Sequence, residues 1–383
     1  MPSLARCFSL SDFIRRSKSQ VPFIAFDYIH RGSGKEITLK NNTESFNDYT
    51  FNPRILINVD KVKLNSTIMG VESSMPFAIA PTGMSRLFHW EGERAVIRAA
   101  EKACIPYSLS TVATTSIEDI TKESPSTPKF FQIYIWKNRK WVYELLERCK
   151  QNKFKGFMLA VDFPTLGNRI KDKKNGHGTK LLRRNMALAA LSKPKWLFNF
   201  LIRDSLKLAN LGHVLPHQGE IQKNIDEVNN QFDASLEWKD ALELKNRAED
   251  FPFFLKGIQS VEDALLAKEN GFKGIILSNH GGRQLDSAPT SLELVPLVRE
   301  AVGPKFEIII DGGITCGSDI IKALCLGADS CLIGKAYLYG LAAGGEAGVS
   351  KVLSIFKEEM ERSLRLIGCP NIKDLNPSYL RKI

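Results

Sequence analysis

Residues 307–335 read EIIIDGGITCGSDIIKALCLGADSCLIGK, and this stretch decides the fold. A continuously apolar run is followed by a Gly-rich turn, by a segment with helical periodicity at 318–328, and by a second apolar run. Apolar runs without alternation are typical of parallel strands that are covered on both faces. The stretch therefore predicts a strand, a helix and a second strand parallel to the first.

The same kind of apolar run occurs eight times along the 383 residues. The runs are PFAIAP (76–81), IPYSLS (105–110), FFQIYI (130–135), FKGFMLAVD (154–162), PFFLKG (252–257), GIILSNH (274–280), EIIIDGG (307–313) and SCLIGK (330–335). Six of the seven intervals between their first residues span 22 to 33 residues, the length of one strand and one helix. Helical periodicity fills several of them, at 92–103, 138–150, 260–270 and 290–302. Eight such units predict an α/β fold, the TIM (β/α)8 barrel.

The fourth interval is the exception, because 98 residues separate the starts of the fourth and fifth runs. We therefore expect a single domain over residues 1–383 that has four parts. They are an N-terminal helical extension at 1–75, a barrel at 76–343, a long insertion at 164–251 after the fourth strand, and a C-terminal helix and tail at 344–383.

Composition excludes several classes of protein. With 43% hydrophobic and 25% charged residues, the chain is typical of a globular protein and not of a disordered one. Its seven cysteines form no C-x-x-C pair, which predicts reduced thiols and no metal site. We find neither a secretory signal nor the roughly 18 apolar residues of a membrane-spanning helix, and we expect a cytoplasmic location. The net charge of +11 leaves nucleic acid, anionic lipid and an anionic small molecule open as partners.

Polar residues stand at the end of nearly every apolar run. They are Ser110, Gln132, Tyr134, Asp162, Lys256, Asn279, His280, Asp311, Gly334 and Lys335. In a TIM barrel the loops that follow the strands converge at one end, and reactive groups lie there. The pattern therefore predicts one site at the carboxyl-terminal ends of the strands.

His280 lies in the densest of these polar stretches, SNHGGRQLD at 278–286. Its ordinary pKa of about 6.5 suits proton transfer at neutral pH. Asp162 can orient and stabilise the imidazolium, and Arg283 adds a planar pair of donors that matches a carboxylate. The alternative is a buried histidine with a purely structural role. The neighbouring arginine, the two glycines and the strand-end position favour a catalytic base.

A phosphate site is predicted after the last two strands. The Asp311-Gly312-Gly313 turn lies between a strand and a helix start, a geometry that presents backbone N–H groups to phosphate, and Gly334-Lys335 follows the next strand. The chain lacks both the G-x-G-x-x-G and the G-x-x-x-x-G-K-[ST] patterns, which argues against Rossmann and P-loop nucleotide sites. The two turns therefore indicate a phosphorylated cofactor.

These motifs together resemble those of one known family, the FMN-dependent α-hydroxy-acid oxidoreductases. The family includes glycolate and lactate oxidases, flavin L-lactate dehydrogenases and mandelate dehydrogenase. The resemblance covers almost the whole chain and is carried by AFDYIHRGSG (25–34), FAIAPTGMS (77–85), SLSTVATTSIEDI (108–120), FFQIYIWKNR (130–139), LAVDFPTLGNR (159–169), FLKGI (254–258), SNHGGRQLD (278–286), DGGI (311–314) and GADSCLIGKAYLYG (327–340). The stretch 278–286 is the most specific of these.

The resemblance implies a role for each matched residue. His280 would be the general base, stabilised by Asp162, and Lys256 would lie beside the N1/O2 edge of the flavin. The substrate carboxylate would be held by Arg169 and Arg283, with Tyr28 and Tyr134 hydrogen-bonding the substrate. The cofactor-binding set would be Ala80, Pro81, Thr82, Ser110, Gln132, Lys256, Ser278, Asp311, Gly312, Gly313, Gly334 and Lys335. The cofactor would be FMN, and the resemblance also implies a homotetramer.

Three positions depart from the pattern of the family. Ala160 stands where a flavin-contacting threonine is usual, Thr315 replaces the phosphate-binding arginine after the DGG turn, and Lys335 replaces a second arginine. Lysine keeps the charge but loses the paired donors of arginine. We expect FMN to bind through backbone groups and Lys335.

The resemblance implies oxidation of an L-2-hydroxy acid, by default L-lactate, to the 2-keto acid. The electrons would pass from the flavin to quinone or another acceptor. The alternatives are an oxidase that reduces oxygen to hydrogen peroxide, and a flavin-binding barrel that has lost catalysis. A basic nucleic-acid-binding barrel is a further alternative, but the chain contains no recognition motif for nucleic acid, and we expect no such partner.

The insertion contains a basic cluster followed by apolar and aromatic residues. The cluster is Lys171, Lys173, Lys174, Lys180, Arg183 and Arg184, and the apolar residues are Trp196, Leu197, Phe198, Phe200, Leu201 and Ile202. Such a segment suits the surface of an anionic membrane, and PKWLFNF resembles the insertion of the membrane-associated bacterial dehydrogenases. We expect peripheral attachment to the inner face of the membrane through 171–205. The alternative is a loop that packs its apolar side on the barrel.

Overall fold

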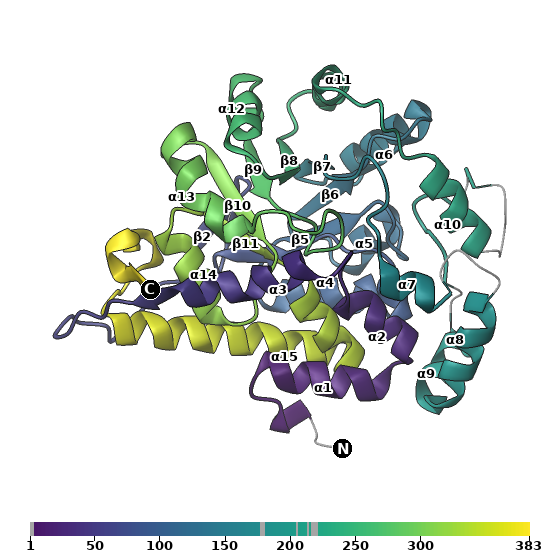
Figure 1. Ribbon diagram of the computed structural model, residues 1–383, viewed down its shortest axis with the longest axis horizontal. Helices are drawn as coiled ribbons and strands as arrows, with labels where there is room; N and C mark the ends of the chain where they lie inside the picture. Colours follow the sequence, from purple (N-terminus) through teal and green to yellow (C-terminus); the bar gives the residue numbers. More distant parts are fainter. Residues whose placement is uncertain (1–3, 177–180, 204–205, 213, 216–220) are drawn as a thin grey trace.

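The computed structural model describes residues 4–176, 181–203, 206–212, 214–215 and 221–383, and for residues 181–184 and 222 it describes the backbone alone. Eight parallel strands form a closed barrel at the centre (Figure 1). They are β4 (Phe77–Ile79), β5 (Tyr107–Ser110), β6 (Lys129–Ile133), β7 (Gly156–Ala160), β8 (Phe253–Ile258), β9 (Gly274–Leu277), β10 (Glu307–Asp311) and β11 (Ser330–Ile333). The strands follow chain order around the barrel, and β11 pairs with β4 to close it. The predicted TIM barrel is confirmed.

A helix follows each strand. The helices are α4 (Glu93–Lys102), α5 (Ile117–Glu123), α6 (Arg139–Gln151), α11 (Trp238–Ala248), α12 (Val261–Glu269), α13 (Ser291–Val302), α14 (Gly317–Cys325) and α15 (Lys335–Ile367). Side-chain caps mark the starts of α5, α6, α12 and α13. The Ser260 hydroxyl accepts the Asp263 N–H at 3.1 Å, and the Thr290 hydroxyl accepts the Glu293 N–H at 3.2 Å.

The strands are shorter than the apolar runs predicted. β7 ends at Ala160 and β9 at Leu277, so Asp162 and His280 lie in the loops that follow. His280 has a φ of 60°, in the left-handed region, which is incompatible with a strand. The prediction that His280 directly ends a strand is therefore wrong by three residues, while the end of the barrel at which it lies is as expected.

Apolar side chains fill the inside of the barrel. They are Ala78, Ala80, Phe130, Met158, Phe254, Ile276, Ile309 and Leu332. A hairpin of β2 (Ser66–Ile68) and β3 (Val71–Ser73) adds Ile68 and Met69, which are fully buried against this set. Because the Met69 N–H donates to Glu307 at the start of β10, the hairpin closes the amino-terminal end of the barrel. A ligand therefore has the carboxyl-terminal end available.

The N-terminal extension and the C-terminal segment lie together. α1 (Leu10–Gln20) packs along α15, and β1 (Tyr49–Phe51) pairs antiparallel with β12 (Leu380–Lys382). α2 (Phe23–His30) and α3 (Ile37–Glu44) lie near the carboxyl-terminal ends of the strands. α15 is interrupted at Gly344 and Gly345, and Gly345 adopts a φ of 60° that favours glycine.

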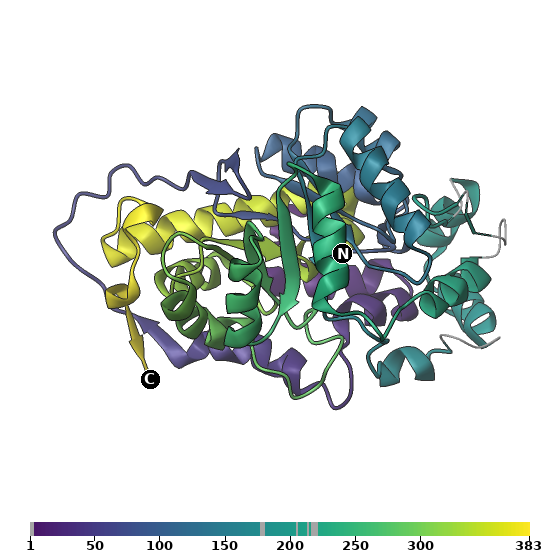
Figure 2. The ribbon, with the colours of Figure 1, turned by 90° about the horizontal axis from the view of Figure 1, so that it is seen from above.

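The insertion contains four further helices, α7 (Ile170–Lys174), α8 (Leu181–Leu191), α9 (Pro194–Ile202) and α10 (Ile221–Asn230). Figures 1 and 2 show α8, α9 and α10 gathered at one edge of the molecule, away from α12 to α14. α11 also lies within 164–251, yet it takes the place of the fourth barrel helix between α6 and α12. In the part of the chain that the structure describes, no helix has the length and apolar character needed to cross a bilayer.

Glu307 is a carboxylate enclosed at the closed end of the barrel. Burial raises the pKa of Glu307 to about 7, although the hydrogen bond of 2.7 Å from the Met69 N–H opposes the rise. Between pH 4.5 and about 7 the folded chain keeps a proton that the unfolded chain releases. Stability therefore falls as the pH rises through this window.

Replacement Glu307→Gln should remove this pH dependence. At pH 8 the variant should be more stable than the wild type by about 1–3 kcal/mol, because no charge is left to desolvate, and the gain should vanish near pH 4.5. Urea unfolding at both pH values measures the difference. Glu300→Gln, at an exposed position of α13, is the matched control. A gain of equal size at both pH values would contradict the assignment.

Candidate active site

A cavity of about 750 Å³ opens at the carboxyl-terminal ends of the strands. It brings together nearly all the site residues predicted from the sequence, whose roles remain predictions. Lining the cavity are Tyr28, Ala80, Pro81, Thr82, Ser110, Gln132, Tyr134, Arg169, Lys256, His280, Arg283, Asp311, Gly312, Gly313, Gly334 and Lys335. Asp162 and Ser278 lie directly behind this wall, where each contacts a lining residue.

His280 and Asp162 form a hydrogen-bonded pair. His280 Nδ1 lies 3.0 Å from Asp162 Oδ2, and the Asp162 side chain is 0% exposed while that of His280 is 23% exposed. Burial alone raises the pKa of Asp162, but the charge and the hydrogen bond of His280 outweigh it, and the pKa is lowered overall. Because Nδ1 is directed to the carboxylate, Nε2 is the nitrogen available to a ligand in the cavity.

The backbone around this pair is shaped by one glycine and one turn. Gly257 has a φ of 106° at an irregularity between β8 and β9, and a Cβ there would lie 2.6 Å from the Cβ of Asp162. The Ser278 hydroxyl accepts the His280 N–H at 3.1 Å, which holds the left-handed turn. Any side chain at 257 would therefore displace Asp162 from His280.

Lys256 is a buried cation on β8 with two partners. Its Nζ donates to Ser278 Oγ at 2.8 Å and lies 2.5 Å from Asp311 Oδ2. In the register of the barrel it lies beside Ala160 of β7, one of the three departures from the family pattern. The lysine is thus held rigidly at the end of β8, and Asp311 partly balances its charge.

Arg169 and Arg283 concentrate positive charge on one side of the cavity. Arg283 donates to the Tyr28 carbonyl at 2.6 Å and stacks on the Tyr28 ring, 4.6 Å from its centroid. Arg169 Nε donates to the Arg283 carbonyl at 3.2 Å, so the two side chains are held close together. Burial, and then the charge of Arg283, lower the pKa of Arg169 to about 10, which leaves the Arg169 guanidinium charged at neutral pH. This arrangement suits a small carboxylate.

Tyr134 is packed among aromatic rings that the sequence analysis did not single out. Its ring centroid lies 5.2 Å from that of Phe163 and 5.4 Å from that of Phe232. Burial, and then the charge of Asp162, raise the pKa of Tyr134, so its hydroxyl is a neutral donor. Phe232 follows α10 and reaches the site because its backbone bridges to Trp136 after β6. No local pattern marks this contact, since it joins residues that are far apart in the sequence.

A flat polar floor lies on the opposite side, over β4 to β6. Ser110 Oγ donates to Gln132 Oε1 at 3.0 Å, while the buried Gln132 Nε2 has no hydrogen-bond partner among the described residues. Thr82 bonds to Tyr337, whose hydroxyl donates to the Ala80 carbonyl at 3.2 Å. The floor thus leaves a buried amide donor without a partner, which an aromatic ring with polar edges would satisfy.

The DGG turn and Gly334-Lys335 form the far end of the cavity. Gly313 has a φ of 78°, and a Cβ there would meet the Asn42 carbonyl of α3 at 1.8 Å, so glycine is required. Thr315 donates to Asp319 through both its N–H and its hydroxyl, at 2.8 and 2.9 Å. The Thr315 hydroxyl is therefore committed to the start of α14 and does not replace the missing arginine.

Lys335 supplies the cation at this end. Its Nζ is buried and has no hydrogen-bond partner within the described residues. Burial, and then the charge of Arg283, lower the pKa of Lys335 to about 7. A phosphate would satisfy this amine and the backbone N–H groups of the DGG turn. The unpartnered donors Lys335 Nζ and Gln132 Nε2, with the glycine turn, fit a flavin mononucleotide.

Comparison with known proteins gives the family. The model of the FMN-dependent dehydrogenase family matches residues 17–382, and the chain belongs to this family. It is accordingly an FMN-dependent oxidoreductase that acts on 2-hydroxy acids.

Curated relatives match over nearly their whole length. A putative L-lactate dehydrogenase of Mycobacterium tuberculosis is 38% identical over 99% of this chain and 90% of its own. An L-lactate oxidase of Nostoc is 37% identical over 99% of this chain and 100% of its own. Glycolate oxidase of Spinacia oleracea is 36% identical over 97% of this chain and 95% of its own.

Solved structures share the fold and the connections. The monotopic membrane protein (S)-mandelate dehydrogenase superposes with a TM-score of 0.93 at 33% identity, covering 99% of this chain and 100% of that one. A flavocytochrome b2 variant with pyruvate bound superposes with a TM-score of 0.83 at 30% identity, covering 99% of this chain and 88% of that one.

Replacement Lys335→Met should weaken FMN binding by about tenfold or more, because it removes one charge-assisted hydrogen bond. In the flavin-free wild type Lys335 has a pKa of about 7, so binding of FMN above that pH must take up a proton. Affinity should therefore fall by up to tenfold per pH unit above about 7. Quenching of FMN fluorescence during titration of the flavin-free protein at pH 6.5 and 8.5 measures both effects.

Lys335→Arg is the matched control for this prediction. Arginine keeps the charge at both pH values, so the variant should bind FMN without the loss of affinity above pH 7. A wild type with the same affinity at both pH values, or a methionine variant that keeps the pH dependence, would contradict the role of Lys335.

Proposed function

We propose that the chain oxidises an L-2-hydroxy acid, with L-lactate first, to the 2-keto acid, using His280 as the base. The observation that carries the proposal is the pair of His280 and the buried Asp162, which faces two buried arginines across one cavity. A base without the arginines, or arginines without a base, would support binding alone.

The polar residues of the cavity have different roles in the proposed reaction. Arg169 and Arg283 hold the carboxylate of the substrate, and the neutral Tyr134 hydroxyl donates to it or to the hydroxyl oxygen. His280 Nε2 takes the hydroxyl proton, and the Asp162 carboxylate stabilises the imidazolium that forms. Bound FMN supplies the two-electron oxidant. Lys256, fixed by Ser278 and Asp311, would hold positive charge beside the bound cofactor.

One part of the remaining wall of the cavity is apolar, which favours a substrate with an apolar side chain. It consists of Met84, Leu166, Phe163, Leu208, Ile225, Val228 and Phe232. The relatives named L-lactate dehydrogenase and L-lactate oxidase, and the neighbour that holds pyruvate, support lactate, whose methyl group such a wall accepts. The mandelate dehydrogenase neighbour supports larger side chains as the next group to be tested.

Quinone at a membrane surface is the acceptor we propose. α9 exposes Phe198 (62%), Leu201 (70%) and Ile202 (62%), and α8 exposes Leu188 and Leu191. Trp196 instead is buried, and Leu197 and Phe200 pack on the core. Three of the six apolar residues in 196–202 therefore fit an exposed membrane face, and the other three fit packing on the barrel. The monotopic neighbour supports attachment through the exposed half. The L-lactate oxidase relative supports the alternative, in which oxygen is the acceptor.

The basic cluster lies only in part beside this face. Lys171, Lys173 and Lys174 are exposed on α7, and Lys173 reaches the rim of the large cavity. Lys180 and the side chains of Arg183 and Arg184 lie outside the described residues.

We also propose a homo-oligomer, the tetramer that the family resemblance implies. Ile55 and Leu56, in the loop before β2, are 82% and 98% exposed. Contiguous exposed apolar surface can mark a contact with another chain, and this adjacent pair supports such a contact.

Replacement His280→Gln should slow anaerobic reduction of the flavin by L-lactate by about 10² to 10⁴-fold, because it removes the base. Stopped-flow loss of the visible flavin absorbance measures the rate, and an unchanged FMN content shows that the variant is folded. A panel of L-2-hydroxy acids then ranks substrates, and oxygen and a soluble quinone are compared as oxidants of the reduced enzyme. If no 2-hydroxy acid bleaches the wild type, the proposed activity is wrong.

The double replacement Phe198→Ser and Leu201→Ser should reduce binding to anionic vesicles by about tenfold to hundredfold, because two apolar side chains no longer leave water. Co-sedimentation measures the bound fraction. The double replacement Leu297→Ser and Leu366→Ser removes exposed leucines of α13 and α15 and should change nothing. Equal loss in both pairs would contradict attachment through α9.

A further inference from the structure

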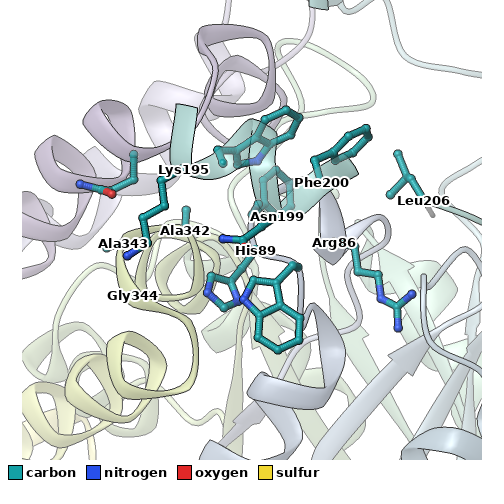
Figure 3. A pocket seen from close by; sticks show the side chains of 13 residues that line it. Arg86, His89, Lys195, Asn199, Phe200, Leu206, Ala342, Ala343 and Gly344 are labelled. Atoms are coloured by element: carbon teal, nitrogen blue, oxygen red, sulfur yellow. The ribbon is translucent and has the colours of Figure 1, made fainter. Parts of the chain in front are cut away.

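A second, smaller cavity lies beneath α9, outside the flavin site. Its volume is about 90 Å³, and it is enclosed by α9, by residues 86–90 after β4, by the end of α1 and by α15 just before its interruption. Figure 3 shows Lys195 and Asn199 pointing from α9 toward His89 and the stretch Ala342 to Gly344. The space holds a small polar group of several atoms but is far too small for the flavin.

α9 presents a different kind of side chain on each of its faces. Trp196 and Phe200 stack at 4.6 Å and face the barrel, where the Trp196 indole N–H donates to the Leu87 carbonyl at 3.0 Å. Lys195 and Asn199, four residues apart on a second face, line the small cavity. The exposed apolar triad of Phe198, Leu201 and Ile202 occupies the remaining face. The small cavity therefore lies at the edge of the apolar surface of the helix.

Lys195, which is exposed to solvent, places a positive charge at the cavity. Lys195 Nζ forms no hydrogen bond or ion pair with any residue that the structure describes. Two carboxylates on neighbouring segments are engaged elsewhere, because Glu91 bonds to Arg98 and lies 3.7 Å from His89 Nδ1, and Glu346 bonds to Arg98 at 2.6 Å and to Lys102 at 2.5 Å. Burial lowers the pKa of His89, so its ring is a neutral hydrogen-bonding group beside the lysine. An anion with several acceptor oxygens matches this set of donors.

Aromatic rings surround these donors. Trp90 and Trp196 line the cavity, and the Arg203 guanidinium lies 4.6 Å from the centroid of the Trp90 ring. Tryptophan is enriched where one end of a side chain meets lipid and the other meets water. Cations at such a boundary gain from the negative potential of anionic lipids. Aromatic rings, a cation and a neighbouring apolar face therefore occur together at one place.

We propose that the cavity under α9 binds the phosphate group of an anionic phospholipid, with Lys195 as its cation and the acyl chains along Phe198, Leu201 and Ile202. The proposal rests on the proposed attachment of α9 to a membrane, and it adds a specific lipid site to a surface that is otherwise nonspecific. A free phosphate ester would satisfy the donors equally, but it leaves the adjoining apolar triad in water. The lipid satisfies both.

The position of the cavity links the lipid to the flavin site. The segment after β4 forms a shared wall, since Arg86, Phe88, His89 and Trp90 line the small cavity while Leu87 lines the large one. The hydrogen bond of Trp196 to the Leu87 carbonyl joins α9 to the same wall. A bound headgroup therefore changes the surroundings of Trp90 and Trp196, which gives a fluorescence signal that is independent of turnover.

Titration of the FMN-loaded protein with dihexanoylphosphatidylglycerol, followed by tryptophan fluorescence, tests the proposal. The wild type should show a saturable change. Lys195→Met should weaken binding by about tenfold or more, and Asn199→Ala should weaken it in the same direction. Lys305→Met, which removes an exposed lysine between α13 and β10, lowers the net charge equally and should stay within about twofold of the wild type. Circular dichroism and FMN content establish that each variant is folded.

Several results would overturn the proposal. Equal losses in Lys195→Met and Lys305→Met would show attraction by net charge alone. Binding of glycerol 3-phosphate as tight as that of the short-chain lipid would show a site for a free phosphate ester, and equal binding of dihexanoylphosphatidylcholine would exclude a preference for anionic lipid. Vesicle binding, measured with the double variant at Phe198 and Leu201, tests membrane attachment independently of the lipid site. If the wild type does not bind vesicles but its lipid titration still depends on Lys195, the proposed membrane attachment is wrong and the proposed lipid site is supported.

Discussion

The hydrogen bond between His280 and the buried Asp162 constrains the rest of the site. A carboxylate that is fully removed from water costs several kcal/mol unless it is paired, so Asp162 must have its partner in the folded chain. Gly257 gives it room, and the turn at Ser278 brings the imidazole to it. The loops after β7, β8 and β9 are therefore fitted to one another. In a closed barrel these loops are neighbours, which is why this fold can hold the pair.

Charge balance explains the remainder of the cavity. Lys256, Arg169, Arg283 and Lys335 all line it, and Lys335 has no anionic partner within the described residues. Burial lowers the pKa of both Arg169 and Lys335, so their buried positive charges destabilise the folded chain when no ligand is bound. Binding of an anionic substrate and a phosphorylated cofactor would offset this destabilisation. Part of the net charge of +11 is thus concentrated where two anions are needed.

The sequence predicted what depends on local pattern. Eight continuous apolar runs were sufficient for the barrel, and polar strand ends were sufficient to find the set that the cavity brings together. Contacts between distant segments could not be predicted from the sequence. Neither the packing of Phe232 against Tyr134 nor the close approach of the Asn42 carbonyl to Gly313 produces a periodic pattern. The same limit applies to the insertion. Its composition could not show that Trp196 faces the barrel while Phe198 faces outward.

The faces of α9 show features of both expectations for the insertion. A helix that packed wholly on the barrel would bury Leu201 and Ile202, whereas one that served only the membrane would not commit the Trp196 indole to the Leu87 carbonyl. Because the inner face is fixed at a wall of the flavin cavity, the outer face keeps a constant position relative to the site. A membrane bound at this surface, as we propose, would therefore lie at a defined place beside the cavity, as the proposed delivery of electrons to quinone requires.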